Sequence, residues 1–174
     1  SYYKPEPLYN DLTRITGLPE NYYYTTAITD SAVSFVRQHP SGEPMFLYVA
    51  HYAPHLPLQA PTERVKECLD RYKVGYDVLR ERRFKRQKEL GLVPREMQLP
   101  VFHKEFGGKR PAWTDLEEEQ QRQWVQNMAT YAAMIEIMDD GIGRLVETIR
   151  QKGMLENTVF LFLSDNGSTN EGGF

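Results

Sequence analysis

The fold is decided by one stretch of the chain, Thr158-Val-Phe-Leu-Phe-Leu-Ser-Asp-Asn-Gly167. Its first six residues are apolar at nearly every position, which is the pattern of a β-strand covered on both faces. Ser164, Asp165 and Asn166 follow directly, and Gly167 lets the backbone turn. Proteins of the α/β class place their chemistry where a buried strand ends in polar residues. The stretch therefore predicts a central strand with a functional site at its carboxyl end.

A long amphipathic helix is predicted before this strand, from about Leu116 to Gln151. Apolar residues recur every three or four positions, so they form one stripe that faces a core. The stripe consists of Trp124, Met128, Tyr131, Ile135, Met138, Ile142, Leu145 and Ile149. Thr114 and Glu117 fit a capping box at the start, and Gly153 suits the left-handed conformation that ends a helix.

An earlier helix and strand repeat this order. A helix is predicted from Thr25 or Thr26 to about Gln38, with a threonine as N-cap and with Ile28, Ala32, Phe35 and Val36 on its apolar face. The apolar run Met45-Phe-Leu-Tyr-Val-Ala50 then predicts a second central strand. Residues 62–113 form an excursion between the two pairs, helical to about residue 90 and loop-like afterwards.

This order implies a right-handed crossover between parallel strands. Two strands cannot form a stable parallel sheet alone. We therefore expect residues 1–174 to be the central portion of a single, larger α/β domain, with residues 62–113 as a helical and loop excursion.

The composition excludes some classes of protein. The net charge is −3, which argues against a nucleic-acid-binding protein. No apolar run approaches the length of a membrane span, and the given chain does not begin with a signal peptide. Cys68 is the one cysteine, so it cannot form an internal disulfide, and we expect an ordinary half-buried residue.

Two groups of residues are candidates for chemistry. Asp165 and Asn166 offer an anionic and a neutral oxygen ligand, which suits a hard cation such as calcium or magnesium. The same residues also suit an ordinary turn, in which Asp and Asn bond their own backbone. His55 lies in the loop His51–Pro61, where three prolines predict an extended, stiff chain. Such a histidine could protonate a leaving group, or could be a structural loop residue.

Six tyrosines lie within residues 1–24. Tyr22, Tyr23 and Tyr24 could line a pocket for a sugar or an aromatic ring, and they could equally pack against the body of the protein. The sequence leaves both interpretations open.

Several motifs together resemble the sulfatase family, arylsulfatase type, within the alkaline phosphatase superfamily. They are Ala53-Pro-His-Leu-Pro-Leu-Gln-Ala-Pro61, Tyr131-Ala-Ala-Met-Ile-Glu-Ile-Met-Asp-Asp-Gly-Ile-Gly-Arg144 and Asn157-Thr-Val-Phe-Leu-Phe-Leu-Ser-Asp-Asn-Gly167. Tyr22-Tyr-Tyr-Thr-Thr-Ala-Ile-Thr-Asp30 is similar to the segment that leads into the first helix of that family. Three motifs in the family's order are far more specific than any one of them.

The resemblance implies a doubly wound, mostly parallel α/β sheet flanked by helices, and the hydrolysis of sulfate esters with one calcium ion. It implies that Asp165 and Asn166 are metal ligands and that His55 contacts the sulfate or its leaving oxygen. The expected substrate is a small-molecule or carbohydrate sulfate ester, and the expected location is periplasmic or secreted. Nothing in the sequence indicates which ester or which oligomeric state.

The family's nucleophile is not in this sequence. It is a formylglycine made from the first residue of a Cys/Ser-x-Pro-x-Arg motif, and neither this motif nor the family's N-terminal pair of aspartates is present. Cys68 is followed by Leu-Asp-Arg and does not match. We therefore expect this chain to hold part of a metal site and to be inactive by itself.

Two alternatives stay open. The parent protein could be a phosphatase, phosphodiesterase or phosphonate hydrolase of the same superfamily, which would use a different nucleophile and a different number of metals. It could also be a non-catalytic binding module that kept the fold and lost the active site.

Overall fold

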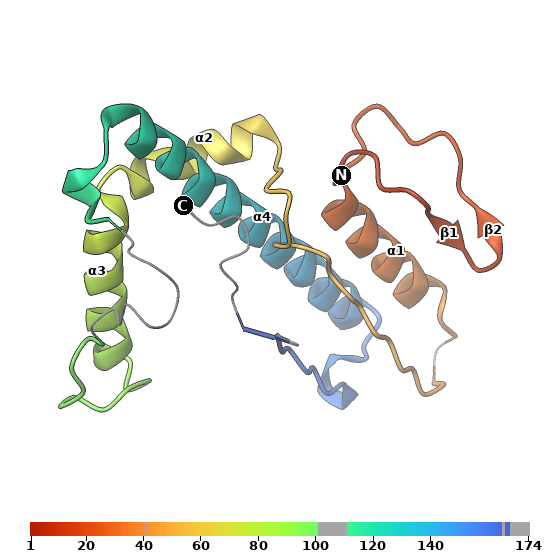
Figure 1. Ribbon diagram of the computed structural model, residues 1–174. Helices are drawn as coiled ribbons and strands as arrows, with labels where there is room; N and C mark the ends of the chain where they lie inside the picture. Colours follow the sequence, from red (N-terminus) through yellow and green to blue (C-terminus); the bar gives the residue numbers. More distant parts are fainter. Residues whose placement is uncertain (41, 101–110, 165, 168–174) are drawn as a thin grey trace. The chain divides into compact units, whose positions relative to one another are not determined.

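A computed structural model describes residues 1–40, 42–100, 111–164 and 166–167 (Figure 1). In chain order the elements are β1 (Tyr9–Asn10), β2 (Thr13–Arg14), α1 (Tyr24–Gln38), α2 (Thr62–Tyr72), α3 (Gly75–Glu89), the 3₁₀ turn η2 (Trp113–Asp115), α4 (Glu118–Gln151) and the 3₁₀ turn η3 (Leu155–Asn157). The chain divides into two compact units. The first contains residues Ser1–Cys68 and Ala129–Phe160, and the second contains Leu69–Met128 and Leu161–Phe174.

The long helix α4 ends at Gln151, where the sequence predicted its carboxyl end. Gly153 adopts a φ of +70°. The N–H of Gly153 donates to the carbonyl of Arg150 at 2.9 Å, and the N–H of Met154 donates to that of Ile149 at 3.1 Å. This pair of bonds is a Schellman motif, which satisfies carbonyls that a helix end otherwise leaves open.

The amino end of α4 differs from the prediction. Leu116 is extended, so the helix begins at Glu118 and the expected box of Thr114 with Glu117 does not form. Instead the backbone N–H of Glu117 donates to the side-chain oxygen of Gln120 at 3.0 Å. Gln120 therefore provides the backward half of a capping box, three residues later than predicted.

The most buried face of α4 lies beside the predicted apolar stripe. Its buried residues are mostly small: Ala129, Thr130, Ala132, Ala133, Met134, Gly141, Thr148 and Ile149. Of the predicted stripe, Ile149 is buried and Tyr131 is exposed, and the other large residues are partly covered. Small residues occupy this face because another helix lies close to the backbone of α4.

That neighbour is α1, which lies beside the later part of α4 within the first unit (Figure 1). A methyl group added to Gly141 would lie 2.4 Å from the hydroxyl oxygen of Thr29. Lys152 donates to the carbonyls of Arg37 at 3.1 Å and His39 at 2.6 Å, so a lysine satisfies the carboxyl end of α1.

The start of α1 corrects two expectations. The helix begins at Tyr24 after Tyr23, which makes no side-chain cap, so a threonine does not cap it. Thr25 and Thr29 are instead buried within the helix. Ala32 and Val36 are buried as predicted, whereas Phe35 is exposed. The hydroxyl of Thr29 bonds the carbonyl of Thr25, which lets a polar residue occupy a buried helical position.

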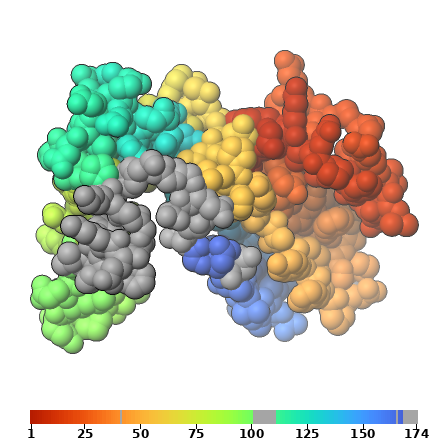
Figure 2. Space-filling view, in the orientation of Figure 1, coloured from red at the N-terminus to blue at the C-terminus, as the bar shows by residue number. Residues whose placement is uncertain are grey.

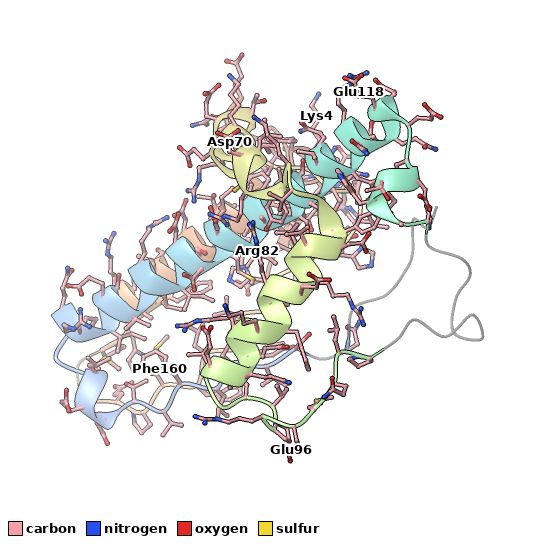
Figure 3. All side chains as sticks on the ribbon, turned by 90° about the vertical axis from the view of Figure 1, so that its left-hand side faces the viewer. Lys4, Asp70, Arg82, Glu96, Glu118 and Phe160 are labelled. Atoms are coloured by element: carbon pink, nitrogen blue, oxygen red, sulfur yellow. The ribbon has the colours of Figure 1, made fainter. Side chains whose placement is uncertain are left out.

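In the second unit, α3 packs against η2. Gly75 has a φ of +82°, and a Cβ there would lie 2.4 Å from the ring of Trp113. Asp77 accepts a 2.7 Å hydrogen bond from the backbone of Trp113, and the ring of Tyr76 meets the Trp113 ring edge-on. Charged side chains, with Arg82 labelled, surround the rest of α3 (Figure 3).

The two predicted strands have no ladder partner among the described residues. The one ladder there joins β1 to β2, antiparallel, with Tyr9 opposite Arg14. In the segment 45–50 every second residue is exposed to solvent, with Phe46 94% and Tyr48 81% exposed. Residues 159–163 are also exposed. The predicted parallel pairing is therefore not seen, as expected for apolar strands that need neighbours on both sides.

None of the helices in the described ranges is both long and apolar enough to cross a membrane.

The crossing of α1 and α4 gives a matched test. We expect Gly141→Ala to destabilise the protein by about 1–3 kcal/mol, because the new methyl group overpacks the contact with Thr29. Gly143→Ala is the control, since nothing lies within 4 Å of its added Cβ, and it should stabilise α4 by about 0.5–1 kcal/mol. Urea unfolding measures both. Equal effects of the two substitutions would show that the helices do not meet at Gly141.

Candidate active site

His55 lies on a turn of the loop that follows the segment 45–50. Its backbone N–H donates to the carbonyl of Tyr52 at 3.0 Å. The chain therefore reverses here and is not fully extended as predicted. His55 is exposed, while Ala53, two residues earlier in the turn, is buried. The ring of His55 is therefore exposed to solvent on a turn that is partly buried.

Tyr2 forms hydrogen bonds with the backbone of this turn. Its ring is fully buried, and its hydroxyl donates to the carbonyls of His55 at 2.8 Å and Tyr52 at 3.2 Å. The backbone N–H of Tyr2 also donates to the side-chain oxygen of Gln59 at 2.9 Å, and the hydroxyl of Tyr23 donates to the carbonyl of Gln59 at 2.8 Å. Figure 2 shows the dark red N-terminal residues against the yellow atoms of this loop. Two tyrosines therefore position the His55 loop through its backbone.

Both hydroxyls keep their protons. Burial raises the pKa of Tyr23 to about 12, and burial together with the nearby Tyr23 and Tyr52 raises the pKa of Tyr2 still further. The two phenols therefore act as hydrogen-bond donors at any ordinary pH.

The aromatic residues near the amino terminus pack into this cluster. The rings of Tyr2 and Tyr23 are stacked at 5.7 Å between centroids, and Tyr2 lies 5.3 Å from Tyr52. Tyr2 and Tyr23 form a buried apolar cluster with Ala53 and Met134. For Tyr23 the packing interpretation is therefore confirmed. The sequence marked Tyr2 only as one of the aromatic residues near the amino terminus, because its hydrogen-bond partners Tyr52, His55 and Gln59 lie 50, 53 and 57 residues away and leave no local pattern.

His51 is half-buried at the start of the same loop. Its Nδ1 is buried and has no hydrogen-bond partner among the described residues. Burial lowers the pKa of His51, because the charged imidazolium loses hydration. His51 is therefore suited to a neutral, structural role, in contrast to the exposed His55.

Of the two predicted metal ligands, Asp165 lies outside the described residues and Asn166 is exposed. The amide nitrogen of Asn166 donates to the carbonyl of Gly167 at 2.9 Å, and the hydroxyl of Ser164 donates to the carbonyl of Asn166 at 2.6 Å. These bonds match the turn interpretation. They also leave the Asn166 amide oxygen, the atom that would bind a cation, without a donor from the described chain.

The described residues contain no group of three or more His, Cys, Asp or Glu side chains that could hold a metal. His55 belongs to the first unit and Asn166 to the second. Cys68 is fully buried, more than expected, and its thiol lies 3.5 Å from a carboxylate oxygen of Glu136. A thiol placed in this way is a packing residue.

Removing the Tyr2 hydroxyl tests its anchoring role. We expect Tyr2→Phe to lower the free energy of unfolding by about 1–3 kcal/mol, because two loop carbonyls lose their donor. Tyr9→Phe makes the same chemical change at an exposed ring and should stay within about 0.5 kcal/mol of the parent. Chemical denaturation measures both. An unaltered Tyr2→Phe midpoint would contradict the anchoring.

His51 gives stability a specific dependence on pH. The unfolded imidazole titrates near pH 6.5, and the folded one takes up a proton only at lower pH. The unfolded state therefore binds more protons below about pH 6.5, so acidification destabilises the fold. His51→Gln should flatten the fall in the free energy of unfolding between about pH 7.5 and 5.5, whereas His39→Gln should retain it. The same slope in both variants would refute this role.

Comparison with known proteins bears on what these residues do. Residues 1–173 match the family described as Sulfatase. The chain is 38% identical to an arylsulfatase of Klebsiella aerogenes over 158 residues, which cover 91% of this chain and 33% of that protein. It is 35% identical to an uncharacterized sulfatase of Schizosaccharomyces pombe, covering 86% of this chain and 26% of the relative.

More distant relatives point the same way. An arylsulfatase of Clostridium perfringens is 26% identical over 90% of this chain and 29% of its own length. A multifunctional alkaline phosphatase superfamily protein of Trinickia caryophylli is 24% identical over 86% of this chain and 28% of its own length. The chain thus spans about a third or less of these relatives. Because the family match covers nearly every residue, the chain belongs to the sulfatase family.

Proposed function

We propose that the whole protein hydrolyses sulfate esters and that this chain supplies the leaving-group histidine and part of a calcium site. One observation carries the proposal: in a member of the sulfatase family, His55 is exposed on a turn whose backbone is held by the buried Tyr2. General acid catalysis needs an exposed ring on a backbone that is held in place, because the proton donor must meet the substrate in a defined position.

His55 acts as the proton donor in this proposal. When the bond between sulfur and the bridging oxygen breaks, negative charge develops on the oxygen of the departing alcohol. A charged imidazolium can transfer its proton to that oxygen, so that a neutral alcohol leaves. His51 is less suited to this role, because burial lowers its pKa and so disfavours the charged form of the ring.

Asp165 and Asn166 would hold the calcium ion through a carboxylate and an amide oxygen. The donor set fits, since calcium prefers oxygen ligands and the Asn166 amide oxygen is not occupied by a described donor. Calcium takes six to eight oxygens, so the remaining ligands must come from other residues. When bound, the cation neutralises charge on the sulfuryl oxygens.

The nucleophile belongs to another part of the protein in this proposal, because the printed sequence lacks a Cys/Ser-x-Pro-x-Arg motif. In the same proposal, residues 1–174 are the central portion of one doubly wound α/β catalytic domain. The exposed apolar segments 45–50 and 159–163 support this, since each resembles a central strand whose neighbours are elsewhere. We also propose a periplasmic or secreted location, for which the family resemblance is the support.

A second candidate is phosphoryl transfer. The similarity to the Trinickia protein, described as multifunctional within the alkaline phosphatase superfamily, favours keeping it. Sulfate and phosphate esters share tetrahedral geometry and differ in charge. A comparison of nitrophenyl sulfate with nitrophenyl phosphate as substrates distinguishes the two.

The test uses the full-length protein and nitrophenyl sulfate. His55→Gln should lower kcat by about 10²–10⁴-fold, the usual contribution of a general acid. Asp165→Asn keeps the size of the side chain but removes a charged ligand, so the calcium concentration for half-maximal activity should rise. His39→Gln, on a side chain bonded to the carbonyl of Glu43, should leave both unchanged.

Three results would contradict the proposal. One is a parent-like rate for His55→Gln, and another is an activity that chelators do not affect. The third is turnover by the purified 174-residue chain alone, since it would show that the nucleophile lies within residues 1–174.

A further inference from the structure

Tyr52 contacts His55 in two ways at once. The two rings are stacked, with 4.8 Å between centroids and 25° between planes. The Tyr52 hydroxyl oxygen also lies 3.1 Å from the imidazole Nδ1 of His55. One tyrosine therefore restrains both the plane and the rotation of the imidazole.

Hydrogen-bond chemistry decides where the proton of the His55 ring lies. Nδ1 is 2.8 Å from the carbonyl oxygen of Leu56, and a carbonyl can only accept. Nδ1 must therefore carry a hydrogen. The Tyr52 hydroxyl donates to the same Leu56 carbonyl at 3.0 Å, which turns a hydroxyl lone pair, an acceptor, towards Nδ1. Two acceptors thus face Nδ1–H.

We propose that Tyr52 is a positioning residue that holds His55 in the Nδ1–H tautomer and leaves Nε2 as the atom that exchanges a proton with the substrate. The catalytic part of this inference rests on the function proposed above. Neutral His55 then has its free lone pair on Nε2, and charged His55 differs only by a proton on Nε2. In both charge states Nδ1 keeps its hydrogen, so the proton needed by the leaving group is carried by Nε2 of charged His55.

Tyr52 is itself well placed for this task. Its carbonyl accepts a bond from the buried Tyr2, and its ring contacts those of Tyr2 at 5.3 Å and Tyr24 at 6.4 Å. The side chain is nevertheless 44% exposed, so one part of the ring packs on the aromatic cluster and another part lies beside His55. Movement of the Tyr52 ring would cost contacts on both sides.

The direct test is nitrogen NMR of the full-length protein labelled with ¹⁵N-histidine. Long-range proton–nitrogen correlation identifies the protonated ring nitrogen, and loss of signals in His55→Gln assigns the residue. We expect neutral His55 to be the Nδ1–H tautomer. Tyr52→Phe keeps the ring and removes the hydroxyl, so the ratio of Nδ1–H to Nε2–H tautomers should fall about fivefold, the effect of one ordinary hydrogen bond. Tyr52→Leu removes the stacked ring as well and should lower the ratio further.

The control is Tyr9→Phe, which removes the hydroxyl of an exposed tyrosine in β1 and should leave the His55 signals unchanged. A thermal unfolding curve shows whether each variant is folded. An Nε2–H tautomer in the parent protein, or an unaltered ratio in a folded Tyr52→Phe, would overturn the inference.

Kinetics separates this inference from the proposed function. If the full-length protein is a sulfatase, Tyr52→Phe should lower kcat about fivefold and leave KM near its parent value, because the hydroxyl orients the acid and does not bind the ester. An absence of sulfatase activity in the parent would defeat the proposed function, while the NMR result would still decide the tautomer. A changed tautomer ratio with unchanged kcat would overturn the catalytic part.

Discussion

The close approach of α1 and α4 is the constraint on which the first unit depends. At Gly141 the two helices meet with no room for a methyl group beside Thr29. The Thr29 side chain is β-branched and stiff and lies where a Cβ at position 141 would be, so a glycine is required at this contact. Lys152 adds a polar contact at the end of α1. Met134, on the same stretch of α4, then joins Tyr2, Tyr23 and Ala53 in the cluster beneath the His55 turn.

Helix ends could be predicted where the signal is local. Gly153 ends α4 as expected, because a left-handed residue needs only its own backbone and the preceding turn. The buried faces were predicted less well. Large apolar side chains dominated the predicted stripe of α4, but the position of α1 decided which side is covered, and that position is encoded by Gly141 and its small neighbours. Helical periodicity indicates that a face exists, and the neighbouring helix selects it.

In the candidate site, too, some residues could be predicted from local sequence and others could not. His55 was a candidate because three nearby prolines and the family's motif mark it in the sequence. Tyr2 and Tyr52 could not be found in this manner. Tyr2 acts from fifty-three residues away on the carbonyl of His55, and no spacing rule joins them. The hydroxyl of Tyr52 is brought to the imidazole only by the turn at residues 52–55. Asp165 was predicted from sequence and lies outside the described residues, so its metal role stays a prediction.

The alternating exposure of residues 45–50 favours self-association of the protein. Phe46 and Tyr48 lie on a bare side, while Leu47 and Val49 are partly covered. The backbone groups of this segment have no ladder partner in the described chain. An extended apolar segment with open hydrogen-bonding groups is a template for another strand, whether from the same molecule or from a second one. At high concentration the 174-residue chain should therefore associate with itself through this edge.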